Sequence, residues 1–208
     1  MRVLALCTAL LAASAAAAHD KAGHGAAGHD EAGHGAAPLT VGLPLPLNIG
    51  GPFRLTDQHG LTRTEAHPAG QMQLLFFGYA NCEQICSAVL PQMAGITAGL
   101  LARGVAITPV MITVDPVRDT TATMTTALAK ISQDFIGLTG DAAALQTAYD
   151  LFAVESEQLF IDPQTGPVYA HGSFMYLLDG KGGFLTLIPP ILSDDRAMDI
   201  IAGYAANG

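Results

Sequence analysis

The sequence predicts an α/β sandwich in which helices flank a central mixed sheet. Two continuous apolar runs, MQLLFFGY and VAITPVMITV, are each followed by a helical pattern, as expected of buried strands in strand–helix units. A later pair of runs, FMYLLD and FLTLI, flanks the turn GKGG and predicts a hairpin. The order strand, helix, strand, helix, hairpin, helix is that of a thioredoxin-like sandwich.

Each element has a local signal. FRLTDQHGLTRTE predicts a short hairpin around DQHG, and MQLLFFGY predicts the first buried strand. After the next loop, apolar residues from Val89 to Leu100 keep a helical spacing. VAITPVMITV predicts a second buried strand, interrupted by Pro109, and FIGLTG a short third one. Three further helices are expected at about 120–133, capped by Thr120 or Thr121, at about 141–152 from Asp141, and at about 193–204, capped by Ser193 or Asp194.

Composition limits the domain count and the classes of partner. The chain has 208 residues, half of them apolar and only 13% charged, which suits one globular core. Its net charge of -9 argues against nucleic acid and anionic membrane surfaces as partners. The same charge is compatible with attracting cations.

The N-terminus predicts export. Arg2 precedes an apolar stretch, Val3 to Leu11, and then a run of small residues of the kind that signal peptidase accepts before a cut. An uncleaved anchor would need about 20 apolar residues to span a bilayer, and this Ala-rich run is marginal for that. We therefore expect residues 1–18 to be a signal peptide that includes Cys7, and the mature protein to be periplasmic without a stable membrane anchor.

Residues 19–37 form a repeat, HDKAGHGAAG followed by HDEAGHGAAP. An Ala/Gly/His sequence cannot form a core, so it predicts a flexible tail, and the globular domain is expected over residues 38–208. The repeat sets four imidazoles five residues apart, and His-rich tracts often bind metal loosely. Weak metal capture and a plain solvated linker are both compatible with this pattern. The four residues are His19, His24, His29 and His34.

The two cysteines of the expected mature chain lie together in FFGYANCEQIC. Cys82 is expected in the strand-to-helix loop and Cys86 in the first helical turn, so that both side chains face the same way. The helix dipole and the unpaired amides at that end favour thiolate over thiol. A pair separated by three residues could close a redox disulfide, or its two soft thiolates could bind Cu(I). Two buried cysteines without a function are the less favoured interpretation.

Three histidines of the globular part could complete a three-coordinate copper site. His59 is expected in a hairpin turn and His67 in a loop, where both are most simply solvated. His171 precedes a core strand in YAHGSFMYLLD, and Gly172 gives the backbone room to bend. In a thioredoxin-like sandwich the loop before this hairpin lies near the start of the first helix. His171 is therefore the preferred third ligand.

A polar stretch, DPVRDT, follows the second predicted strand. The simplest interpretation of Asp115, Arg118 and Asp119 is a strand-end turn and helix cap in which Arg118 pairs with a carboxylate. The alternative is that these residues steer the thiolates or dock a client protein.

Taken together, FFGYANC...C, ITVDPVRDT, FIGLTG and AHGSFMYLLD, in this order and at these separations, resemble the Sco/SenC family of copper chaperones from Phe53 to Tyr204. The resemblance implies a thioredoxin-like fold and a site for Cu(I) or Cu(II) made by the two cysteines of a C-x-x-x-C motif and a distant histidine, here Cys82, Cys86 and His171. It also implies service to the dinuclear copper centre of cytochrome c oxidase.

Two departures from the family pattern bear on function. Family members usually have proline after each cysteine, whereas this chain has Glu83 and Ser87. The usual member is also membrane-anchored, whereas this chain is expected to be cleaved. The client implied by the resemblance is an oxidase copper subunit, with a periplasmic copper donor upstream. The alternative function is that of a thiol-disulfide oxidoreductase that reduces the cysteines of a copper-accepting client or acts in periplasmic redox balance or copper defence.

Overall fold

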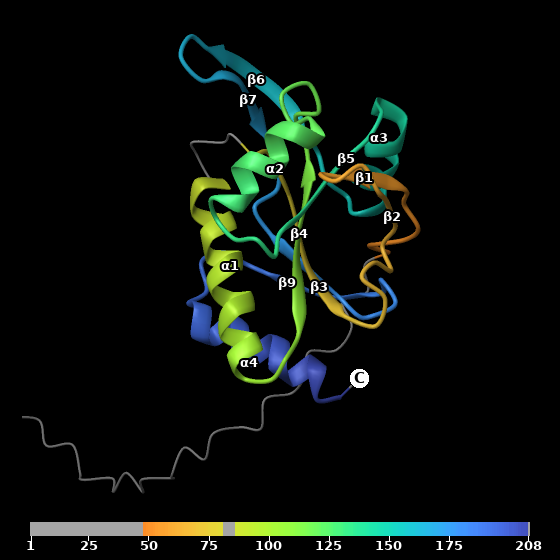
Figure 1. The fold of residues 1–208 in the computed structure, drawn as a ribbon, viewed down its shortest axis with the longest axis vertical. Coiled ribbons are helices and arrows are strands. Elements are labelled where there is room, and N and C mark those ends of the chain that lie inside the picture. The colour runs from red at the N-terminus through yellow and green to blue at the C-terminus, as the bar shows by residue number, and fades with distance from the viewer. Residues whose placement is uncertain (1–47, 81–85, 208) are drawn as a thin grey trace, which may run out of the picture. The chain divides into compact units, whose positions relative to one another are not determined.

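The computed structural model describes residues 48–80 and 86–207, which form nine strands and four helices (Figure 1). The strands are β1 Leu55–Asp57, β2 Thr62–Arg63, β3 Met72–Gly78, β4 Ile107–Thr113, β5 Ile136–Thr139, β6 Glu157–Asp162, β7 Gly166–Ala170, β8 Met175–Leu178 and β9 Phe184–Ile188. The helices are α1 Cys86–Ala102, α2 Thr121–Ala129, α3 Ala142–Leu151 and α4 Asp194–Ala205.

Seven of the described strands form one mixed sheet in the order β2-β1-β5-β4-β3-β8-β9. The central strands β3, β4 and β5 are parallel, and β1, β2, β8 and β9 add antiparallel edges. The parallel strands are joined by α1 and α2, because a connection between parallel strands must cross the length of the sheet. The antiparallel pairs β1–β2 and β8–β9 are hairpins with short loops. This architecture confirms the predicted sandwich of a mixed sheet and flanking helices.

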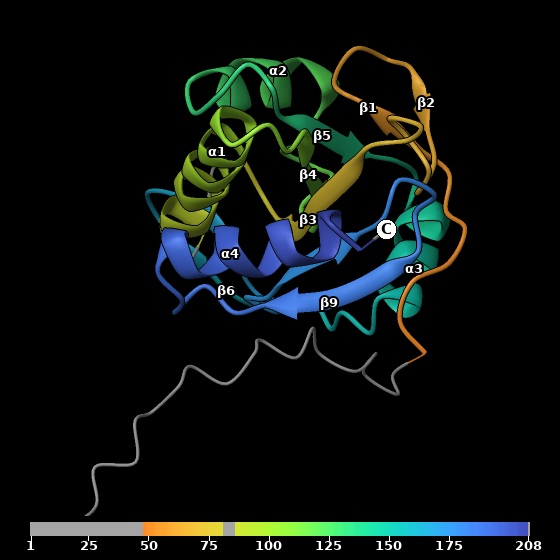
Figure 2. The ribbon, with the colours of Figure 1, turned by 90° about the horizontal axis from the view of Figure 1, so that it is seen from below.

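The alternation of side chains along β3 places α1 and α3 on opposite faces of the sheet. Phe77 points to one face, where its ring meets those of Tyr149 and Phe152 from α3 and its C-terminal end. On the other face, a Cβ on Gly78 would lie 3.1 Å from the Sγ atom of Cys86 at the start of α1. Figures 1 and 2 show α1 with α4 beside it and α3 apart from them. The apolar core fills both faces of the central strands.

The predicted helix starts are confirmed. Thr120, Asp141 and Ser193 cap α2, α3 and α4, and each side chain accepts a hydrogen bond from the backbone N–H three residues ahead. These caps satisfy backbone donors that the first helical turn leaves unpaired. The helix starts are therefore set locally, by residues adjacent to the helices themselves.

Three details differ from the sequence-based expectations. Pro109 does not interrupt β4, because pairing with β5 begins only at Val110 and the missing N–H of Pro109 costs no bond on that side. Helix α2 ends at Ala129 rather than near Gln133, because the amides of residues 130–132 turn back onto the carbonyls of the last helical residues. The β6–β7 hairpin was not expected at all.

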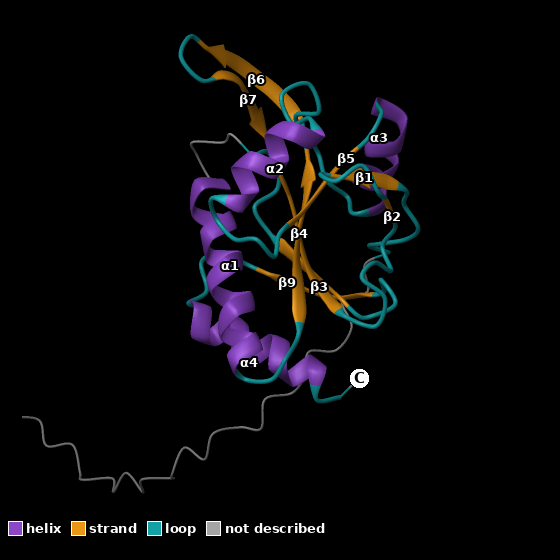
Figure 3. Cartoon of the chain, in the orientation of Figure 1, coloured by secondary structure: helices purple, strands orange, loops and turns teal. Residues whose placement is uncertain are grey.

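The β6–β7 hairpin is a separate two-stranded sheet that projects from the seven-stranded one (Figure 3). Five of the six residues of β6 are exposed, including Leu159, Phe160 and Ile161. A strand with both faces in solvent lacks the alternating pattern by which strands are recognised in a sequence. Among the described residues, no helix combines the length and the apolar character needed to cross a membrane.

Candidate metal centre

The candidate centre lies at the carboxyl edge of the parallel strands, where β3 leads towards α1. Cys86 is the first residue of α1, and its side chain is buried, with 1% of its surface exposed. Gly78, the last residue of β3, lies opposite this side chain. A Cβ at Gly78 would lie 3.1 Å from the Cys86 Sγ atom and 2.5 Å from the Phe76 ring, so glycine leaves space for both side chains. The dipole of a helix start favours a negative charge and so eases the loss of the thiol proton that metal binding by Cys86 would require.

His171 lies next to Cys86, although 85 residues separate them in the chain. It follows β7 directly, and its Nε2 atom is 3.4 Å from the Sγ atom of Cys86. Its Nδ1 atom is 3.0 Å from the carbonyl oxygen of Gly172. Because a carbonyl only accepts, Nδ1 carries the proton in this contact, and the lone pair of a neutral ring lies on Nε2. With this tautomer the Cys86 thiol donates to Nε2, and the lone pair that accepts this bond is the one that a metal shared by the two side chains would use.

Aromatic side chains hold the imidazole in place. The ring of Phe76 meets the His171 ring edge-on at a centroid distance of 5.7 Å, and the ring of Tyr79 does so at 5.9 Å. Tyr79 in turn contacts Tyr169 of β7 at 5.7 Å. Sequence reasoning missed these residues as part of the site. Phe76 and Tyr79 stand in the same FFGYANC stretch as Cys82, but nothing in the pattern points to Tyr169.

The other predicted site residues are placed as follows. Cys82 and Glu83, like the four tail histidines, lie outside the described residues. His59 and His67 are exposed in loops between β1 and β2 and between β2 and β3, as expected. His67 contacts the hydroxyl of Thr64 at 2.9 Å. The structure therefore brings Cys86 and His171 together, and their assignment with Cys82 as copper ligands remains a prediction. Among the described residues, no three Cys, His, Asp or Glu side chains form a metal-sized group.

The DPVRDT stretch forms the expected turn and ion pair beside this centre. Arg118 pairs with the buried carboxylate of Asp115, while Thr120 supplies the helix cap. Asp119 is fully buried and accepts hydrogen bonds from the Ala80 amide at 2.9 Å and the Thr113 hydroxyl at 2.8 Å. Burial raises the pKa of Asp119 above its ordinary value. The stretch is thus linked to Ala80, which lies two residues after the end of β3 and two before Cys82.

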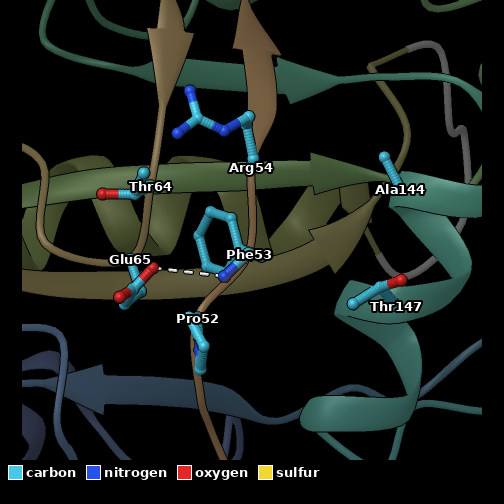
Figure 4. Close-up of a pocket in the computed structure, with 7 residues that line it drawn as sticks. All are labelled: Pro52, Phe53, Arg54, Thr64, Glu65, Ala144 and Thr147. Carbon is cyan, nitrogen blue, oxygen red and sulfur yellow. Dashed lines mark hydrogen bonds between the residues drawn. The ribbon is translucent and has the colours of Figure 1, made fainter.

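Two hollows differ in what they offer chemically. A groove of about 370 Å³ between the end of α3 and the end of β7 includes His171 in its wall, so that the imidazole can be reached from solvent. A second hollow of about 380 Å³ lies between the start of β1 and α3 (Figure 4). Its wall contains the Phe53 amide, which donates to Glu65 at 3.1 Å, and neither cysteine nor histidine. Only the first hollow is relevant to a metal centre.

The sequence matches the model of the SCO1/SenC family over residues 43–206. The chain belongs to the SCO1/SenC family. Membership confirms the resemblance seen in the four sequence motifs, which extend from β3 to the end of β8.

Relatives within the SCO1/SenC family include an SCO2-like protein of Rickettsia felis, 36% identical over 76% of this chain and 77% of that protein. SenC of Rhodobacter capsulatus is 34% identical over 66% of this chain and 62% of its own length.

Solved structures of Sco proteins share the fold. Yeast Sco1 with copper bound matches with a TM-score of 0.72 and 27% identity, over 78% of this chain and 91% of that one. Arabidopsis thaliana ScoI with copper bound matches with a TM-score of 0.73 and 26% identity, over 77% and 99%. The thioredoxin-like fold expected from the order of elements is therefore the fold of the family.

Proposed function

We propose that this Sco/SenC protein is an exported copper chaperone. It binds copper through Cys82, Cys86 and His171 and delivers it to the dinuclear copper centre of cytochrome c oxidase, whose copper subunit is the client. The observation that carries the proposal is the 3.4 Å approach of the His171 Nε2 atom to the Cys86 sulfur. Further support comes from copper-bound family members of the same fold, yeast Sco1 and Arabidopsis thaliana ScoI.

The donor set suits copper on chemical grounds. Thiolates are soft ligands that favour Cu(I), and an imidazole nitrogen extends the site to Cu(II), which prefers nitrogen or oxygen among its ligands. The lone pair of Nε2 already faces the Cys86 sulfur, and the Gly172 carbonyl holds the ring tautomer that leaves this lone pair available to a metal. The groove beside His171 gives an acceptor access to the imidazole, which a cargo site requires and a buried structural site does not.

Export and periplasmic location belong to the same proposal. They are supported by the signal-peptide pattern of residues 1–18 and by the bacterial relatives. A copper donor would act before this protein and the oxidase subunit after it.

A second candidate function is thiol-disulfide exchange, favoured by the position of Cys86 at a helix start, where thiolates are stabilised. In that case Cys82 and Cys86 would cycle between dithiol and disulfide to reduce the cysteines of a client, or would act in periplasmic redox balance or copper defence. The imidazole is not needed for such a cycle, whereas it completes a copper site. His171 therefore separates the two functions.

The test compares His171→Ala with wild type, using His59→Ala as the matched control. For a copper chaperone, His171→Ala should lose the sulfur-to-Cu(II) charge-transfer absorption and about 10- to 100-fold or more in Cu(II) affinity. Its disulfide reductase rate should stay near the wild-type value, because the thiol couple contains no imidazole. Unchanged copper spectra with impaired reductase turnover would instead support the oxidoreductase.

A further inference from the structure

The guanidinium of Arg118 is fastened to the hairpin that leads to His171. Its Nη1 donates to the carbonyl of Thr165, just before β7, and its Nη2 donates to the carbonyl of Pro167 within β7 at 2.5 Å. The side chain is 23% exposed, so these bonds are shielded in part from water. Two charge-assisted bonds from one planar group fix both the position and the direction of the strand.

The opposite side of the same guanidinium faces the segments around the metal centre. Its Nε donates to the buried carboxylate of Asp115, and its Cζ lies 5.3 Å from the centre of the Tyr79 ring. Asp115 also accepts a bond from the Tyr169 hydroxyl of β7 at 3.4 Å. Each nitrogen of the guanidinium thus has a partner, on Asp115 or at the start of β7, and the Tyr79 ring adds a contact from a third segment.

These contacts surround the imidazole without touching it. β7 ends at Ala170, one residue before His171, and the Tyr79 ring beneath the guanidinium meets the His171 ring at 5.9 Å. The backbone that carries His171 and the ring against which it rests are therefore both held by one side chain.

We infer that Arg118 is the positioning residue of His171, holding β7 and the Tyr79 ring so that the imidazole faces the Cys86 sulfur. The inference deepens the proposed function, because the position of His171 matters for copper affinity only if His171 is a ligand. Groups that orient a metal ligand typically change metal affinity 10- to 100-fold when they are removed. No other described arginine or lysine has partners around this centre.

Gly166 provides a second way to test the same contact. Its φ of +83° is rare for residues with a side chain, and a Cβ there would lie 2.9 Å from the Nη1 atom of Arg118. Gly166→Ala should therefore displace the guanidinium while leaving its charge in the protein. Arg118→Lys keeps the charge as well but cannot make the paired bonds to Thr165 and Pro167.

The first measurement needs no copper. In the reduced, metal-free full chain, the imidazole resonances of His171 carry ring-current shifts from Phe76 and Tyr79. Arg118→Ala, Arg118→Lys and Gly166→Ala should each change these shifts. The matched control is Arg103→Ala, which removes an arginine that pairs with Asp195 and Asp199 instead. If the His171 imidazole resonances keep their wild-type chemical shifts in all three variants, the inference is overturned, whether or not the protein binds copper.

The second measurement is a double-mutant cycle on Cu(II) affinity, determined by competition with a chelator and followed by the absorption of the copper–chelator complex, which does not depend on His171. Arg118→Ala should weaken binding about 10- to 100-fold in the wild-type background. In the His171→Ala background it should change the remaining affinity by less than about twofold, as expected when one residue acts through the other.

The cycle also separates this inference from the proposed function. An equal loss in both backgrounds, or no loss in either, would overturn the role of Arg118. If His171→Ala itself leaves copper binding unchanged, the proposed ligand set fails, and the imidazole resonances alone decide whether Arg118 positions His171. Melting temperatures of all variants identify any that fail to fold, and Arg118→Lys or Gly166→Ala then replaces Arg118→Ala in the cycle.

Discussion

Asp119 connects two strand ends at the edge of the candidate centre. One carboxylate oxygen accepts both the Ala80 amide, beyond β3, and the hydroxyl of Thr113, the last residue of β4. Its other oxygen has no hydrogen-bond partner among the described residues, although it is buried. Burying an ionised carboxylate costs free energy unless its oxygens are paired, and burial accordingly raises the pKa of Asp119. The nearby carboxylate of Asp115 acts in the same direction.

The raised pKa predicts how stability depends on pH. Between the ordinary value of 3.8 and the raised value, the folded chain binds more protons at Asp119 than the unfolded chain does. The contribution of Asp119 to the free energy of unfolding therefore falls as pH rises through this window and stays low above it. Asp119→Asn, which cannot titrate, should lack this fall.

The measurement is denaturant unfolding of wild type and Asp119→Asn at a series of pH values from 3.5 upwards, at intervals of about 0.5. Asp134→Asn, at an exposed site, is the matched control. If Asp119→Asn and wild type show parallel curves, the carboxylate of Asp119 does not titrate differently in the folded chain.

At the same scale, sequence context was enough to predict which of the three histidines of the globular part lies beside Cys86. The adjoining AHGSFMYLLD pattern places it before a core strand, and the thioredoxin-like order of elements brings that loop to the start of the first helix. The contacts of Tyr169 and Arg118 could not be predicted in the same way. They depend on how the unexpected β6–β7 hairpin is set against the main sheet.

At the scale of elements, local signals predicted starts better than ends. Thr120, Asp141 and Ser193 are caps whose hydrogen bonds are made within four residues, so the sequence around them is sufficient. The end of α2 is set by the amides of residues 130–132, which turn back onto the carbonyls of Ala127 and Leu128, while the Leu128 side chain packs against Gly137 of β5. Such tertiary contacts leave no local pattern.

The N-cap of α3 gives an element-scale prediction. Asp141 accepts the Ala144 amide at 2.8 Å and sets a negative charge at the positive end of the helix dipole. Asp141→Ala should therefore lower the free energy of unfolding by about 1 kcal/mol. Asp150→Ala makes the same chemical change in the last turn of α3, where a negative charge is unfavourable, and should leave stability within about 0.5 kcal/mol of wild type. Equal losses in denaturant unfolding would argue against capping.

At the scale of the whole molecule, the metal centre follows from the topology of the sheet. The parallel strands β3 and β4 end at the same edge, and β3 pairs on its other side with β8, which follows His171 by a few residues. The first helix and the segment before β8 therefore meet at the end of β3. The carboxyl ends of the strands are also where open α/β sheets usually bind their ligands. This meeting was predictable from the order of elements, whereas Cys82 itself lies outside the described residues.

The last prediction concerns the tail, residues 19–37, which also lie outside the described residues. An Ala/Gly/His repeat buries almost no apolar surface, so replacing His19, His24, His29 and His34 by alanine in the full chain should not change the melting temperature. Imidazoles bind Cu(II), Ni(II) and Zn(II) without selecting strongly among them, so the variant should lose weak capacity for all three metals.

The tight site with sulfur-to-copper absorption should remain at about one copper per chain in this variant, because thiolates outside the tail supply it. The matched control replaces His59 and His67, the exposed histidines of the folded part, and should retain the weak capacity. The measurement is metal stoichiometry at equilibrium dialysis for each of the three ions, with copper followed in addition by its charge-transfer absorption. Equal stoichiometry for wild type and the tail variant would mean that the tail is a linker only, and that the negative charge of the chain attracts cations without holding them there.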